Sequence, residues 1–151
     1  MNTEHQTIMA RALAEAEAAA ARGEVPVGAV VTGPDGAVLA AAGNRVEELN
    51  DPSAHAEILA IRAAAAKIGS PRLIDCDLHV TLESCPMCAQ GISFASIRRL
   101  VFGAYDPKGG GVEHGSRIYS QPTCHHAPEV VGGVEESRAG DLLRKFFQDR
   151  R

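Results

Sequence analysis

The stretch TLESCPMCAQG, residues 81–91, decides how the chain is interpreted, because it holds a single C-x-x-C pair, Cys85 and Cys88. A strand-like run, LHVTLE, precedes the pair, and CPMCAQGISFAS continues as a helix, since proline is tolerated in a first turn. A structural zinc site needs four protein ligands, whereas a dithiol redox pair needs only its two cysteines. The pair is therefore half of a metal site or a complete redox site.

The composition predicts one globular domain over residues 1–151. The chain is long enough to bury a substantial core, and its apolar fraction of 45% and charged fraction of 23% are ordinary. No apolar run reaches the roughly 20 residues of a membrane span, and the acidic N-terminal segment is unlike a signal peptide. We therefore expect a cytoplasmic protein without a membrane segment, whose four cysteines serve metal binding or catalysis rather than disulfides.

Helical and strand patterns alternate along the chain, which predicts a layered α/β domain around one sheet. Ser53 and Ser84 are the expected N-caps of the second and third helices, and Gly23 and Gly69 the expected stops of the first and second. The predicted helices cover 3–22, 50–69, 85–96 and 136–150, and the predicted strands 25–32, 37–44, 78–83, 98–105 and 129–134.

Further metal ligands are available in SAHAEIL, residues 53–59. His55 and Glu57 stand two positions apart near a helix start, so they can meet one object only beyond the N-terminal end of that helix. Cys85 and Cys88 are neighbours at the start of another helix. Two helix starts can therefore point at one spot, where their dipoles favour the thiolates that zinc requires.

Three protein ligands, His55, Cys85 and Cys88, leave a fourth position open, which is typical of a catalytic zinc. Zinc lowers the pKa of a bound water toward about 7, and Glu57 can carry protons as a general acid and base. Alone, H-x-E is commonly a surface pattern and C-x-x-C also fits a redox pair. Their joint occurrence favours one catalytic Zn²⁺ per subunit.

HAE followed by TLESCPMCA resembles the cytidine/deoxycytidylate deaminase superfamily. The segments EVPVGAVV, AGNR, DPSAHAEILAIR, RRLVFGAYDPKGG and SQPTCHHAP resemble bacterial tRNA-specific adenosine deaminases within it, over nearly the whole chain. The resemblance implies one zinc-dependent deaminase domain with a three-layer α/β/α fold and a mixed five-stranded sheet. It also implies a homodimer that converts adenosine to inosine at the wobble position of an arginine tRNA anticodon.

The resemblance further implies substrate contacts from Asn44, Ala56, Asp106 and Lys108. From the residues alone, Asn44 in GNR is more simply a turn former. GAYDPKGGG does not match a phosphate loop, because Pro107 stands where glycine is required, so DPKGGGVEHGS is expected to be a flexible substrate loop.

One departure from the superfamily pattern lies directly before the first cysteine, where Ser84 replaces a proline and Pro86 follows instead. We expect Ser84 to cap the helix and zinc binding to survive. In PTCHHAP, Cys124, His125 and His126 are adjacent; adjacent residues rarely coordinate one ion together, so loop packing or RNA contact is favoured over a second metal site.

Charge is distributed unevenly along the chain. The net charge is -4, but residues 98–151 hold nine Lys or Arg against seven Asp or Glu, a local balance of +2. From charge alone, a solvated helix face is the simpler interpretation of the basic tail. With the resemblance, the tail is expected to contact a tRNA anticodon arm through Arg144, Lys145, Arg150 and Arg151.

Two alternatives remain open on the sequence. One is the same zinc chemistry on a free base or nucleoside, such as guanine or cytosine. The other is a non-catalytic, zinc-stabilised RNA-binding module.

Overall fold

The computed structural model describes residues 3–150, and within that range helices and strands alternate as the sequence pattern predicts. The elements are α1 (Thr3–Ala21), β1 (Gly28–Thr32), β2 (Val38–Gly43), α2 (Val46–Leu49), α3 (Ala56–Ile68), β3 (Asp77–Leu82), α4 (Pro86–Phe94), β4 (Arg99–Ala104), η1 (Ile118–Ser120, a 3-10 turn), β5 (Glu129–Val131) and α5 (Glu136–Gln148).

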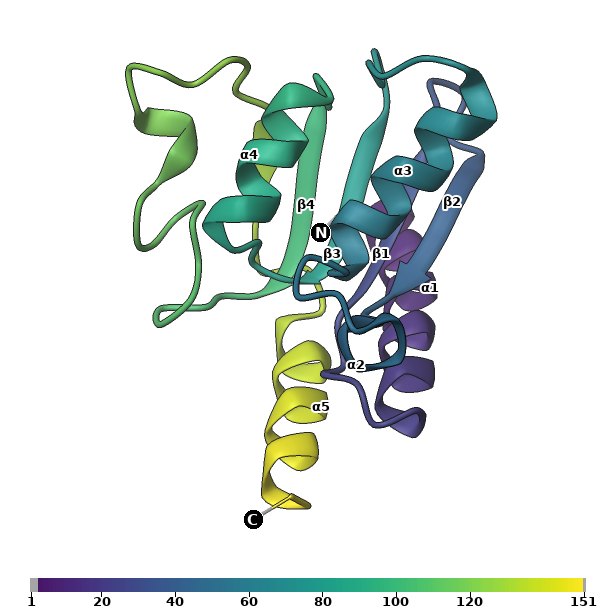
Figure 1. Cartoon of the computed structure of the whole chain (residues 1–151), viewed down its shortest axis with the longest axis vertical. Coiled ribbons are helices and arrows are strands. Elements are labelled where there is room, and N and C mark those ends of the chain that lie inside the picture. Colours follow the sequence, from purple (N-terminus) through teal and green to yellow (C-terminus); the bar gives the residue numbers. More distant parts are fainter. Residues whose placement is uncertain (1–2, 151) are drawn as a thin grey trace.

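The five strands form one mixed sheet in the order β2-β1-β3-β4-β5. Strand β1 pairs antiparallel with β2 and β3, while β4 pairs parallel with β3 and β5. Helices α3 and α4 cover one face of the sheet, and α1 and α5 pack on the other (Figure 1). This arrangement confirms the predicted three-layer α/β/α fold.

Alternate residues of the strands supply the two halves of the core. Leu78 and Val80 of β3 point into the cluster beneath α3 and α4, whereas Val30 and Val101 point into the cluster beneath α1 and α5. Helix α1 lies so close to β1 that a side chain at Gly28 would overlap the Ala12 carbonyl. The small residues of the sequence thus bring this helix directly onto the sheet.

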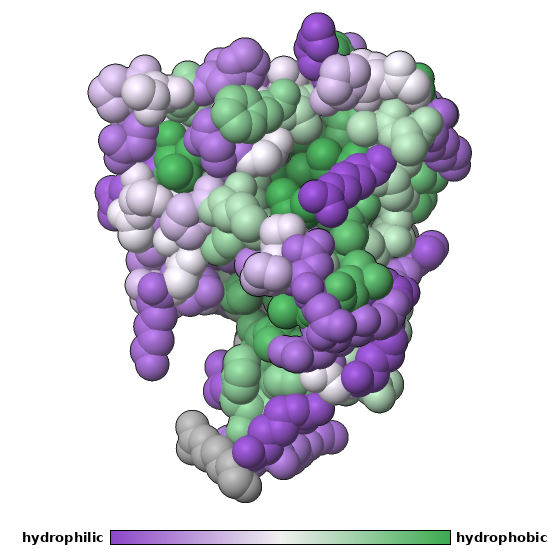
Figure 2. All heavy atoms as spheres, viewed as in Figure 1, coloured by the Kyte–Doolittle hydropathy of each residue, from purple (hydrophilic) through white to green (hydrophobic). Residues whose placement is uncertain are grey.

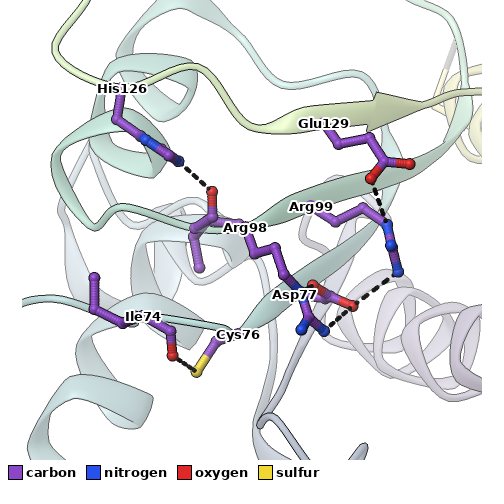
Figure 3. A network of polar contacts seen from close by, with 8 residues as sticks. Ile74, Cys76, Asp77, Arg98, Arg99, His126 and Glu129 are labelled. Carbon is purple, nitrogen blue, oxygen red and sulfur yellow. Dashed lines mark hydrogen bonds and ion pairs between the residues drawn. The ribbon is translucent and has the colours of Figure 1, made fainter.

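Ion pairs tie together the parallel strands at the end where they begin. Arg98 donates to both carboxylate oxygens of Asp77, at 2.9 and 3.2 Å. Arg99 joins Asp77, at 3.4 Å, to Glu129, at 3.3 Å (Figure 3). Because both arginines are partly exposed, water screens these pairs, and their effect is to link the starts of β3, β4 and β5.

Both predicted helix caps were wrong. His55, not Ser53, is the N-cap of α3, because Asp51 accepts the Ser53 backbone N–H at 2.9 Å and its hydroxyl at 2.7 Å, which holds Ser53 in the preceding turn. Cys85, not Ser84, is the N-cap of α4. Each helix therefore begins directly after a predicted metal ligand.

The predicted start of the first strand was too early, and one short helix was not predicted. Strand β1 begins at Gly28 rather than at 25, because Pro26 has no N–H and the N–H of Val27 bonds the Val25 carbonyl instead. The short helix α2 has no sequence signal of its own. Glu24, far away in sequence, accepts the N–H groups of Glu47 and Glu48 at its start, at 3.1 and 2.9 Å.

No helix within residues 3–150 is long and apolar enough to cross a membrane.

Candidate metal centre and substrate cleft

The structure brings the three predicted metal ligands together at the starts of α3 and α4. The Nδ1 atom of His55 lies 3.6 Å from the sulfur of Cys85 and 3.4 Å from the sulfur of Cys88. All three ligand atoms lie within 4.8 Å of one another, and within the described residues no other group of three or more His, Cys, Asp or Glu side chains converges in this way. His55 and Cys85 are the N-caps of their helices, and Cys88 stands one turn into α4.

The spacing of these atoms fits a tetrahedral zinc ion. With Zn–S near 2.3 Å and Zn–N near 2.1 Å, the nitrogen and sulfur corners of a tetrahedron lie about 3.6 Å apart. The two measured nitrogen–sulfur distances, 3.4 and 3.6 Å, are close to that value. An imidazole and two thiols are also the donor types that zinc prefers.

The ionisation of the cysteines suits a cation. The pKa of the Cys85 thiol falls to about 4, chiefly because the Cys88 thiol donates a hydrogen bond to it, and although burial opposes this, the His55 ring lowers it further. The pKa of Cys88 is raised for the complementary reason, since its proton is shared with Cys85. The bond to Cys85 also raises the pKa of His55. The pair thus holds one thiolate already, and a coordinated thiol is deprotonated outright.

Glu57 lies beside this cluster, in the first turn of α3, with only 4% of its surface exposed. Burial raises the pKa of its carboxyl group, and the nearby Ser84 hydroxyl opposes that shift only in part. A carboxyl group whose pKa is raised by burial takes up a proton more readily than an exposed one, which favours a role as a general acid and base.

A cleft of about 560 Å³ opens onto the cluster. Asn44 lines it, and the Asn44 side-chain oxygen accepts the backbone N–H of Ala56 at 2.7 Å. This bond fixes the amide orientation, so the NH₂ group of Asn44 is the part left for a ligand. It also occupies the Ala56 N–H, and the Ala56 side chain is buried in the core.

Of the two residues on the loop after β4 that were expected to contact the substrate, only one lines the cleft. Asp106 lines the cleft, whereas Lys108 is exposed and is not part of the lining. The loop that carries them was expected to be flexible, but Glu83 binds it: the backbone N–H groups of Asp106 and of residues 112–114 all donate to the Glu83 carboxylate.

Glu83, Glu24 and Phe146 also line the cleft and were not among the predicted site residues, whereas Arg150 was predicted as an RNA contact of the basic tail. Glu83 and Glu24 are buried carboxylates, Phe146 belongs to α5, and Arg150 lies just beyond the end of that helix. The guanidinium of Arg150 stacks over the Phe146 ring, 3.5 Å from its centroid. The i, i+4 spacing of an aromatic and an arginine at a helix end was a usable signal; the position of both carboxylates in the cleft depends on tertiary contacts.

The side chains of PTCHHAP have separate partners. The Cys124 sulfur lies 3.8 Å from the Ser93 hydroxyl, and the Nε2 of His126 lies 2.9 Å from the Ile97 carbonyl. The His125 ring packs against Phe94. Loop packing therefore accounts for all three residues.

Comparisons with known proteins agree with this geometry. Residues 2–104 match the model of the cytidine and deoxycytidylate deaminase zinc-binding region. A tRNA-specific adenosine deaminase from Agrobacterium fabrum is 56% identical over 98% of this chain and 97% of its own length. A solved structure from work on A-to-I editing by tRNA:A34 deaminases is 58% identical, with a TM-score of 0.88 over 89% of this chain and 97% of that chain. A guanine deaminase from Nitrosomonas europaea is 26% identical, with a TM-score of 0.80 over 93% of this chain and 83% of that chain.

Proposed function

Because the chain belongs to the cytidine and deoxycytidylate deaminase family, and within it to the tRNA-specific adenosine deaminases, we propose that it deaminates adenosine to inosine at the wobble position of a tRNA anticodon. The observation that carries this proposal is the arrangement of a buried carboxyl group, Glu57, beside a His–Cys–Cys cluster at the floor of a cleft. The resemblance points to an arginine tRNA, and to action in the cytoplasm by residues 1–151 as one domain.

His55, Cys85 and Cys88 are the proposed ligands of one Zn²⁺ per subunit. The ion, when bound, supplies Lewis acidity and lowers the pKa of a water molecule toward neutrality. The helix starts that carry the ligands place them without a mobile loop, since His55 and Cys85 are themselves N-caps.

The protein's own groups then bind the base and move protons. Glu57 accepts the proton of the attacking water and returns it to the amine nitrogen that leaves as ammonia. The NH₂ group of Asn44, fixed by Ala56, donates to a ring nitrogen of the purine. A base can reach this depth only out of its stack, which a single-stranded anticodon loop permits.

The RNA is held by the rim of the cleft. Asp106 and Lys108 lie on the loop after β4, and Arg150 lines the cleft together with Asp106. Of the other basic residues in the tail, Arg144 pairs with Asp141, Lys145 is exposed and is not among the lining residues, and Arg151 lies outside the described residues. The phosphate contact of the tail is therefore assigned to Arg150.

A homodimer is supported by the outer face of α3 and α4. Helix α4 carries no charged residue, although part of it is exposed in the single chain. Met87 and Phe94 on this helix are 41% and 60% exposed, and hydrophobic side chains gather on the face that α3 and α4 form (Figure 2). We assign this face to contact with a second copy of the chain.

Free guanine is the competing substrate, because a guanine deaminase shares the fold. Incubation of the purified protein with total tRNA, and separately with free guanine, cytosine and adenosine, distinguishes the two activities. Inosine in the tRNA digest without ammonia from the free bases is the expected result. If ammonia forms from a free base and the tRNA contains no inosine, the protein is a free-base deaminase. If neither substrate is deaminated, the remaining hypothesis is a non-catalytic RNA-binding module.

A further inference from the structure

Glu83 lies outside the catalytic cluster, directly after β3 and before Ser84. Its side chain is completely buried and lies at the wall of the cleft. One carboxylate oxygen, Oε2, accepts the N–H groups of Val112, Glu113 and His114, at 3.3, 2.9 and 3.0 Å. The other, Oε1, accepts the N–H of Asp106 at 2.9 Å and lies 2.8 Å from Nδ1 of His114.

These contacts join the two ends of the loop that runs from Asp106 to His114. Four backbone N–H groups converge on one carboxylate, and hydrogen bonds to a charged acceptor are the stronger kind. Asp106 also accepts the N–H of Gly109 at 2.9 Å, which closes a turn around Pro107 and Lys108. The loop residues that face the substrate are thus built on Glu83.

The sequence of the loop is adapted to this anchor. A side chain at Gly110 would place its Cβ 2.5 Å from Oε2 of Glu83 and 2.5 Å from the Asp106 carbonyl. The loop backbone can close over the carboxylate only because this position has no side chain. The run of glycines that first suggested flexibility instead allows close packing.

We propose that Glu83 is a positioning residue for substrate recognition: it holds the 106–114 loop in the geometry in which Asp106 and Lys108 meet the nucleotides that flank the target base. The inference rests on the proposed function, because it gives the loop an RNA substrate. Glu83 does not touch the reacting atoms and acts through the loop, so its loss weakens RNA binding more than the chemical step.

Glu83→Gln is the sharpest variant. Its amide can keep one oxygen toward the three N–H groups of residues 112–114, but its NH₂ group then faces the N–H of Asp106, and that bond is lost. The KM for an anticodon stem-loop is expected to rise about tenfold or more, with kcat changed less than about threefold and zinc content unchanged. Hydrogen exchange should quicken in residues 106–114 and not in β3.

A double-mutant cycle separates positioning from general loss of stability. If Glu83 acts through the loop, the KM of the Glu83→Gln, Lys108→Ala double variant rises by much less than the product of the two single-variant increases. Glu24→Gln is the matched control, because Glu24 is another buried carboxylate of the same cleft that holds α2 instead of the loop. The KM increase of the Glu24→Gln, Lys108→Ala double variant should equal the product of the two single-variant increases.

Gly110→Ala tests the anchor from the loop side and leaves Glu83 intact, which covers the case in which Glu83→Gln fails to fold. Gly110→Ala should raise the KM for the anticodon stem-loop as Glu83→Gln does, with a smaller change in kcat. If Glu83→Gln or Gly110→Ala lowers kcat with KM unchanged, or if the Glu83 and Lys108 effects multiply fully, the inference is overturned while the proposed function stands. A wild-type protein that edits no anticodon RNA overturns both.

Discussion

At the scale of single residues, the ligand cluster is what the sequence predicted best. His55, Cys85 and Cys88 converge because each stands within one turn of a helix start, and that is a local property which spacing reveals. The role of Glu83 depends on which distant segments fold beside it, so local spacing does not predict it. Ser53 and Ser84 were assigned as caps on residue type alone, and the competing bonds of Asp51 explain the first error.

The first prediction concerns the metal. Cys88→Ala should lose stoichiometric zinc, because two ligands bind the ion far more weakly than three. Cys124→Ala is the matched control, since its sulfur lies beside Ser93 and outside the cluster. Metal analysis of both purified variants provides the test, and full zinc retention by Cys88→Ala would remove the assignment.

The second prediction concerns Glu57. Glu57→Gln is nearly isosteric but cannot take up the proton, so deamination should fall by about 10⁴-fold, the upper end of general acid–base effects. Zinc content and the melting temperature should stay close to wild type. Single-turnover rates on an anticodon stem-loop measure the loss. Activity within a few-fold of wild type would assign proton transfer to another group.

At the scale of elements, α5 packs on the sheet and also contributes Phe146 to the lining of the cleft. The range of this helix was predictable from the sequence, but its reach to the cleft was not, because that depends on where β5 ends. The same limit applies to α2, whose four residues are held by a carboxylate from the segment after α1. Short elements of this kind have too few residues for a periodic signal.

The third prediction separates the basic residues of the C-terminal tail. Arg150→Gln should raise the KM for anticodon RNA several-fold and reduce the salt dependence of binding by a slope of about one, because the residue lines the cleft and Phe146 holds it in place. Arg144→Gln is the control, as Arg144 pairs with Asp141 on the same helix. Binding measured across a salt series compares them. If the two changes affected RNA binding equally, the tail would be a solvated face without a specific contact from Arg150.

At the scale of the whole molecule, the apolar face of α3 and α4 is the feature that the single chain leaves unexplained. The fourth prediction is that Phe94→Glu converts a dimer into a monomer, because a charge would be buried without a partner. Phe147→Glu changes another half-exposed phenylalanine, on α5, and should leave the dimer intact. Sedimentation velocity reports both. A dimer that survives Phe94→Glu would place the interface elsewhere.

The fold class and the ligand set were predictable because both follow from local patterns: alternating elements, and ligands at helix starts. The hydrogen bonds between Glu83 and the loop of residues 106–114 were not predictable, because they depend on tertiary contacts, and Gly110 permits the close approach.

The most direct test of the central claim compares two synthetic anticodon stem-loops that differ only in whether the single adenosine stands at the wobble position or one nucleotide away. The claim predicts inosine at the wobble position, little product from the shifted substrate, and none from free guanine. Equal deamination of both stem-loops, or deamination of free guanine with neither stem-loop edited, would contradict it.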